Sequence, residues 1–245
     1  MKALVFNPGF HEFMLISCMG VITENIRLLK QELPDNVKLV AVSKTKSVEE
    51  IMEAYRAGHR IFGENRVQEL LSKYEHLPDD IQWHMIGHLQ RNKVKYIAPF
   101  VKLIESVDSV KLLGTINKEA EKTGRTIDCL LQFHIAKEET KFGFSIEEAV
   151  EMIESGILDE LMNVKIRGVM GMATFTGDME LVRSEFVFLK AVYEELKERF
   201  FSGKYDFNEV SMGMSGDYKV ALEEGSTIVR IGTSIFGERF CKIDN

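Results

Sequence analysis

The chain has 245 residues, of which 45% are hydrophobic and 28% are charged. This is ordinary globular composition, and the length suits one or two domains or a single α/β barrel. The formal net charge is −7. That balance argues against a general nucleic-acid binder, because such proteins need a basic face to displace phosphate counterions.

The N-terminal residues differ in pattern from the rest of the chain. Residues 15–18 read Leu-Ile-Ser-Cys and resemble a lipoprotein cleavage site. Polar residues such as Asn7 and Glu12 interrupt the apolar stretch that a signal peptide requires. No apolar run approaches the roughly 20 residues of a membrane span. We therefore expect that residues 1–18 form a leader and that residues 19–245 form a domain. We expect no membrane association.

The chain has three cysteines, Cys18, Cys129 and Cys241. Their odd number and wide separation suit neither a metal site nor a disulfide framework. A protein with this cysteine usage is expected in a reducing compartment, so we expect a cytoplasmic location and no metal ligands.

Helical and strand spacings of apolar residues alternate along the chain. The first expected helix has Ile22, Ile26 and Leu29 on one face and ends before Pro34. Later, Ser47 and Ser145 each stand three residues before a glutamate, which is capping-box spacing. The expected strands are Val37–Val42, His59–Phe62, Ile81–Ile86, Val101–Ile104, Ile127–Ile135, Val164–Met170, Glu209–Met212 and Thr227–Ile231. The expected intervening helices cover 48–57, 64–74, 90–97, 109–122, a segment opening at 145, 179–196 and 215–224.

Strand and helix alternate in this way eight times. The pattern predicts the α/β class and a single (β/α)8 TIM barrel with an extra N-terminal helix. The competing architecture is an open doubly wound sheet. It is disfavoured because no glycine-rich fingerprint follows the first strand.

In such a barrel the functional site lies at the carboxyl ends of the strands. Lys44 follows the first strand, which is apolar enough to be buried on both faces. Partial desolvation favours a neutral amine, the form that condenses with a carbonyl. The alternative is a lysine that extends to solvent and pairs with a carboxylate.

Glycine and hydroxyl residues follow the seventh and eighth strands, at 211–217 and 232–233. Barrels often bind phosphate in these two loops. Glycines let backbone N–H groups approach an anion, and hydroxyl groups add donors. The pair of turns predicts a phosphate site, although Ser215 alone also reads as a helix N-cap.

Arg230 is a charge within the apolar eighth strand, so it needs a partner. That partner is either a structural carboxylate or a ligand. A carbonyl-reactive lysine, a phosphate site and an arginine together suggest pyridoxal 5′-phosphate (PLP), which carries an aldehyde, a phosphate and a pyridine nitrogen.

Seven segments also resemble motifs of the pyridoxal phosphate homeostasis protein family. They occur in order over about residues 19–239. They are residues 41–46, 62–69, 83–93, 139–143, 167–172, 211–217 and 229–237. The resemblance implies a single barrel of the alanine racemase N-terminal type that binds PLP.

The resemblance also implies roles for individual residues. Lys44 would form the internal aldimine, and Arg230 would face the pyridine nitrogen. Asn65 and His84 would line the ring pocket, and Met212 would pack against the cofactor. The implied phosphate-binding residues are Ser211, Ser215, Gly232 and Thr233. No catalytic residue is implied. His134 departs from the family pattern, which often has a small polar residue there.

The family resemblance implies a non-catalytic protein of vitamin B6 homeostasis that hands PLP to recipient enzymes. An arginine at the pyridine nitrogen keeps that nitrogen unprotonated, which weakens the ring as an electron sink. Racemases of this fold add a second domain, for which we expect no room after the eighth strand. We expect a monomer. The alternatives are a PLP-dependent amino-acid racemase or transaminase, a Schiff-base aldolase for a sugar phosphate, and an interaction module.

Overall fold

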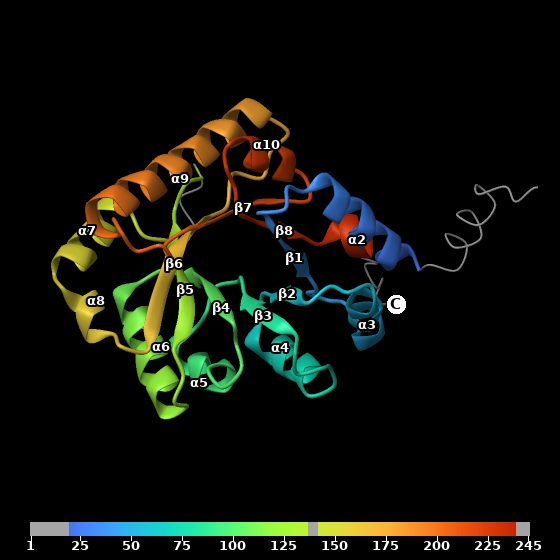
Figure 1. Ribbon diagram of the computed structural model, residues 1–245, viewed down its shortest axis with the longest axis horizontal. Coiled ribbons are helices and arrows are strands. Elements are labelled where there is room, and N and C mark those ends of the chain that lie inside the picture. The colour runs from blue at the N-terminus through green and yellow to red at the C-terminus, as the bar shows by residue number, and fades with distance from the viewer. Residues whose placement is uncertain (1–19, 137–141, 239–245) are drawn as a thin grey trace, which may run out of the picture.

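Eight short strands alternate with helices along the chain and pair in sequence order, the last with the first. All the pairings are parallel, and the strands form a closed barrel (Figure 1). The computed structural model describes residues 20–136 and 142–238. The strands are β1 (Lys38–Val42), β2 (Ile61–Glu64), β3 (Gln82–Met85), β4 (Leu103–Val107), β5 (Ile127–Phe133), β6 (Val164–Gly171), β7 (Glu209–Met214) and β8 (Ile228–Ile231). The predicted fold is confirmed.

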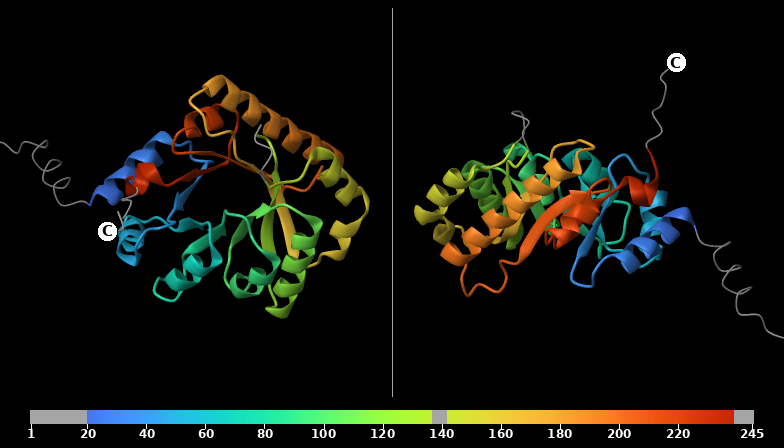
Figure 2. Two further views of the ribbon diagram at one scale, coloured as in Figure 1. Left: turned by 180° about the vertical axis from the view of Figure 1, so that it is seen from behind. Right: turned by 90° about the horizontal axis from the view of Figure 1, so that it is seen from above.

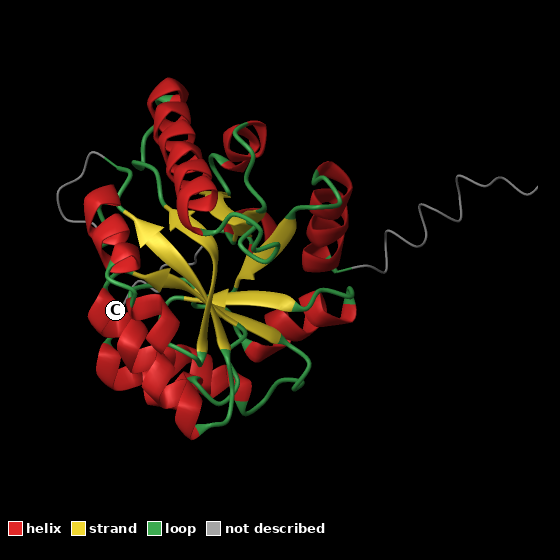
Figure 3. Ribbon diagram, turned by 60° about the vertical axis from the view of Figure 1, so that its left-hand side comes forward, coloured by secondary structure: helices red, strands yellow, loops and turns green. Residues whose placement is uncertain are grey.

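A ring of helices surrounds the strands (Figure 3). The longest, α9, lies along the outside of β6 and β7 (Figures 1 and 2). The helices are α2 (Val21–Glu32), α3 (Val48–Arg56), α4 (Val67–Tyr74), the 3-10 turn η1 (Arg91–Lys93), α5 (Val94–Ile97), α6 (Val110–Lys122), α7 (Ile146–Glu154), α8 (Ile157–Glu160), α9 (Met179–Phe200), α10 (Tyr218–Glu223) and α11 (Thr233–Phe236).

Side chains on each strand alternate between the helices and the barrel interior. In β1, Leu39 and Ala41 belong to the large core under the helices. Val40 instead packs in a separate cluster with residues of four other strands. This alternation follows from the two-residue period of a strand. It decides which side chains can reach a site inside the barrel.

Both predicted capping boxes are confirmed. The hydroxyl groups of Ser47 and Ser145 accept hydrogen bonds from the backbone N–H groups of Glu50 and Glu148. The glutamate side chains bond back to the serine N–H groups, so the starts of α3 and α7 are satisfied locally.

Four strand predictions ended too early, since the sixth strand extends to Gly171 and the seventh to Met214. The second strand extends to Glu64 and the fourth to Val107, because polar residues continue both strands in buried positions. Glu64 is paired with Lys73, and Glu105 with His84. The predicted helix at 215–224 begins only at Tyr218. Before it, Asp217 closes a turn by accepting the Met214 N–H.

Some predictions concern residues outside the described ranges. They include the leader at residues 1–18, Cys18 and Cys241. Cys129 is described and is a buried free thiol, and burial raises its pKa. Within residues 20–136 and 142–238, no helix is both long and apolar enough to cross a membrane. The same residues contain no cluster of three side chains suited to a metal ion.

Candidate functional site

A cavity of about 440 Å3 opens at the carboxyl ends of the strands. This is the size range of small-molecule sites, and the end of the barrel where such sites form. Six of the residues predicted from sequence line it: Lys44, Asn65, Ser215, Arg230, Gly232 and Thr233. Apolar side chains, among them Ile86, Met172 and Met214, form much of the remaining wall.

Lys44 comes from the end of β1, directly after the buried strand. It is half-buried and lines the cavity together with Val42, two residues earlier. Val42 ends β1, and Lys44 lies in the turn that follows it. An amine at this position can meet the carbonyl group of a bound ligand.

Arg230 belongs to a buried network inside the barrel. Its Nη2 donates to the Gly171 carbonyl at 2.9 Å, and its Nη1 donates to the Ser211 hydroxyl. Ser211 in turn donates to Glu105 Oε2 at 2.6 Å, and this oxygen lies 3.8 Å from Arg230 Nη1. The other Glu105 oxygen lies 2.6 Å from Nδ1 of His84. The network therefore joins side chains of β3, β4, β7 and β8.

The charges in this network compensate one another. Burial opposes ionisation of Glu105, but the hydrogen bond and charge of His84, with Arg230 and Ser211, outweigh it, so the Glu105 pKa lies below its ordinary value. Burial lowers the pKa of Arg230, and the charges of Glu105 and Asp217 oppose that shift. A guanidinium stays protonated in proteins, so the network holds a fixed cation at the cavity wall.

Hydrogen-bond donors suited to an anion lie on the β8 side of the cavity. The Ser215 hydroxyl accepts the N–H groups of Gly232 and Ser234, at 3.2 and 3.5 Å. A Cβ at Gly232 would come within 3.2 Å of the Val42 carbonyl, so the glycine lets this turn approach β1. Two N–H groups thus converge on the Ser215 hydroxyl, which can itself donate to an anion, and a turn of this kind is suited to a phosphate.

Asn65, which follows β2, adds a polar side chain to the cavity wall on the other side of β1 from β8. Its Oδ1 is buried and accepts no hydrogen bond from the described part of the protein. Gly87 passes so close that a Cβ there would lie 2.5 Å from the Asn65 carbonyl oxygen. The loops after β2 and β3 therefore pack tightly around Asn65, a cavity-lining residue whose buried acceptor a polar ligand can satisfy.

Three predicted residues do not line the cavity. His84 and Ser211 are buried beneath it, where both bond to Glu105. Met212 follows Ser211 on β7 and therefore faces the other way, into the core under the helices. His134 is also absent from the cavity wall, and its buried Nε2 has no partner among the described residues.

Sequence reasoning missed one charged member of the site. Asp217 lines the cavity, and burial raises its pKa, although the Met214 N–H and the Arg230 charge oppose the shift. It also missed Glu105. A charged residue in an otherwise apolar strand was the signal that singled out Arg230, and the same signal at Glu105 identifies its partner.

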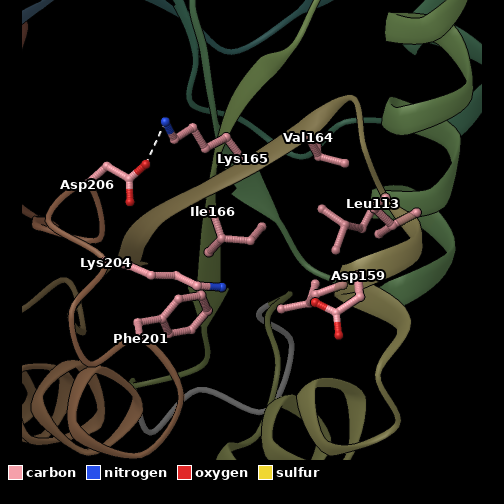
Figure 4. Close-up of a pocket in the computed structure, with 10 residues that line it drawn as sticks. Leu113, Asp159, Val164, Lys165, Ile166, Phe201, Lys204 and Asp206 are labelled. Carbon is pink, nitrogen blue, oxygen red and sulfur yellow. Dashed lines mark ion pairs between the residues drawn. The ribbon is translucent and has the colours of Figure 1, made fainter.

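A second, smaller cavity of about 230 Å3 lies at the other end of β6 (Figure 4). Its wall includes Val164 and Ile166 of β6 and Phe201. The charged pair there, Lys165 and Asp206, is 2.5 Å apart and partly exposed. Such surface pairs contribute little, and this cavity has none of the buried charge found beneath the first.

Comparison with known proteins identifies relatives. Residues 19–240 match the family model described as alanine racemase, N-terminal domain. The pyridoxal phosphate homeostasis protein of Aquifex aeolicus is 45% identical over 203 residues, which cover 82% of this chain and 87% of the relative. The human protein of the same name is 39% identical over 212 residues, covering 82% and 76%.

Solved structures agree with these relatives. The structure of PipY from Synechococcus elongatus PCC7942 with PLP bound has a TM-score of 0.79 and 36% identity, covering 88% of this chain and 100% of PipY. Alanine racemase of Clostridium difficile has a TM-score of 0.69 at 15% identity, covering 90% of this chain and 56% of the racemase, and shares the fold. The chain therefore belongs to the pyridoxal phosphate homeostasis protein family, within the fold family of the alanine racemase N-terminal domain.

Proposed function

We propose that this protein binds PLP in the cavity at the carboxyl ends of the strands and serves vitamin B6 homeostasis. One observation carries the proposal: Lys44, Arg230 and the donors around Ser215 line a single cavity. Their chemistry matches the aldehyde, the ring nitrogen and the phosphate of PLP. The names of the relatives and the PLP-bound structure of PipY support the same ligand.

The residues present suit the cofactor group by group. Lys44 would hold it covalently as a Schiff base, and Arg230 would face the pyridine nitrogen. Ser215, Gly232 and Thr233 would hold the phosphate. The unpaired Asn65 oxygen would meet a polar group of the ring. When bound, PLP supplies a conjugated ring that withdraws electrons from a substrate amine.

The proposal includes the absence of catalytic turnover. The titratable residues that line the described part of the cavity are Lys44, Asp217 and Arg230. Asp217 already accepts the Met214 N–H. No histidine, tyrosine or cysteine stands at the described wall as a second acid–base. A fixed guanidinium at the ring nitrogen also weakens the electron sink. The protein would act as a monomer in the cytoplasm and deliver PLP to recipient enzymes.

Borohydride reduction tests this proposal. Purified protein with PLP should show visible absorbance of the imine, and reduction followed by peptide mapping should place the cofactor on Lys44. Lys44→Ala should lose the absorbance and the labelled peptide. Cofactor on another lysine would overturn the site. Amino-acid racemisation or transamination that disappears in Lys44→Ala would overturn the non-catalytic role in favour of an enzyme. Trapping of a sugar phosphate on a colourless protein would indicate an aldolase.

A further inference from the structure

The turn that carries Lys44 has an unusual backbone. The residue after it, Thr45, has a φ of +66°, and no other non-glycine residue in the described ranges has a positive φ. A β-branched side chain is strained in this region. Such a conformation persists only where the surrounding contacts hold it, and it often marks a functional site.

Contacts from α4 hold the turn on both sides of Lys44. The Thr45 N–H donates to Glu69 Oε1. The carbonyl of Ser43 accepts a hydrogen bond from Lys73 Nζ at 2.7 Å. Lys73 also donates to Glu69 Oε1 at 2.7 Å, so one ion pair of α4 fixes both neighbours of Lys44.

Lys73 is held as firmly as the turn. Its side chain is only 6% exposed, and its third hydrogen bond runs to Glu64 Oε1 at 2.7 Å. An ammonium group has three donors, so all of them are used. Glu64 is fully buried and also accepts the Ser43 hydroxyl at 2.6 Å. None of these side chains lines the cavity, and β2 and α4, which carry Glu64 and Lys73, contact each other.

We propose that Glu69 and Lys73 are positioning residues that lock the turn between β1 and α3 and thereby aim the Lys44 amine at the aldehyde of PLP. This inference rests on the proposed function. In the step concerned, Lys44 Nζ bonds to the aldehyde carbon, and the carbonyl oxygen leaves as water with the two amine protons. Condensation needs the reacting atoms in near-attack geometry, which small displacements disrupt.

Glu69→Ala is the informative variant, because the Glu69 side chain is 23% exposed and the buried pair of Lys73 with Glu64 remains. It removes the acceptor of the Thr45 N–H, so the turn should relax. The rate of imine formation with PLP, followed by absorbance and borohydride trapping, should fall on the order of tenfold. Binding of pyridoxine 5′-phosphate, which has an alcohol in place of the aldehyde, should stay the same.

Two further variants separate positioning from general damage. Glu75→Ala removes the same charge from the exposed end of α4 and should react like the wild type. Glycine adopts positive φ without strain, so Thr45→Gly should restore fast imine formation to Glu69→Ala. A protein that was merely destabilised would gain nothing from that second substitution.

The inference is overturned if Glu69→Ala forms the imine at the wild-type rate, or if it loses pyridoxine 5′-phosphate and PLP to the same extent. Those results leave the proposed function intact when the wild type still traps PLP on Lys44. A wild type that binds PLP and is never labelled on Lys44 overturns the proposed function, and the positioning role with it.

Discussion

Two buried ionic networks flank the same cavity, one inside the barrel and one outside it. The inner network joins Arg230 of β8 to Glu105 of β4 and, through it, to His84 of β3. The outer network joins Glu64 of β2 to Lys73 of the next element, α4. Lys73 also donates to the carbonyl of Ser43, the residue after β1. The inner network presents a side chain to the cavity, whereas the outer network fixes a stretch of backbone.

The difference shows two ways to preorganise a ligand site. Arg230 must keep its charge in a buried place, so it needs a full set of partners, which Ser211, Gly171 and Glu105 provide. Around Lys44, the α4 contacts hold the backbone of its neighbours, Ser43 and Thr45. One network therefore orients a side chain through its own partners, and the other fixes the turn that carries a side chain.

The largest expected effect comes from breaking the inner network. Glu105→Ala leaves Arg230 and His84 buried without their carboxylate, so the free energy of unfolding should fall by about 3–5 kcal/mol. Urea denaturation monitored by circular dichroism measures this loss. PLP affinity should fall as well, because the guanidinium loses its orientation.

The outer counterpart, Lys73→Met, should cost less, about 1.5–3 kcal/mol. Glu69 is partly exposed, and burial already raises the pKa of Glu64, so this carboxyl takes up a proton more readily when its partner is lost. If Lys73→Met were the more damaging of the two variants, the ranking of the networks would be wrong.

Ser211 of β7 and Ser215 of the turn after it should differ in role. We expect Ser215 to affect ligand binding and Ser211 to affect stability. The Ser215 hydroxyl lines the cavity and can donate to the phosphate, so Ser215→Ala should weaken PLP binding about tenfold and leave binding of pyridoxal, which has no phosphate, unchanged. Ser211 bonds to Glu105 beneath the cavity, so Ser211→Ala should lower the free energy of unfolding by about 1–3 kcal/mol.

Isothermal titration with both ligands, next to urea denaturation, tests this division. If Ser211→Ala instead lost affinity for PLP and not for pyridoxal, Ser211 would bind the phosphate, as the family motif implies.

Much of the fold was predictable because its signals are local. The apolar periodicity and the capping boxes at Ser47 and Ser145 identified the order of the elements, and the strand count identified the barrel. The failures at Glu64 and Glu105 share one cause. A charged residue ends a strand in a sequence pattern, but a partner from a distant segment can keep it buried within the strand.

Part of the site was also predictable from the sequence. Lys44 and Arg230 were found because they follow or interrupt buried strands, and Asn65 because it belongs to a family motif; all three line the cavity. Met212 was expected there because it belongs to the motif, yet the alternation of β7 turns it outward. Glu69 and Lys73 act from a helix, and no spacing rule relates them to the turn they hold.

The smallest expected effect is on the pH dependence of stability, which should have opposite signs for the two networks. The Glu105 pKa lies below its ordinary value, because His84, Arg230 and Ser211 outweigh the effect of burial, whereas burial raises the pKa of Glu64 despite Lys73. Glu105 therefore stabilises the fold above the ordinary glutamate pKa of 4.5, and this contribution is lost as the pH falls through its lowered value. Glu64 favours folding at low pH, and its contribution is lost as the pH rises through its raised value.

Glutamine substitutions keep the shape of both side chains and isolate this effect. The stability advantage of the wild type over Glu105→Gln should shrink as the pH falls, and its advantage over Glu64→Gln should shrink as the pH rises. Urea denaturation of the three proteins between about pH 3 and 8 measures both trends. Slopes of the same sign would mean that the two carboxyl groups lie in equivalent electrostatic environments. The inner network, in which partners outweigh the burial of Glu105, would then not differ from the outer one, in which burial dominates at Glu64.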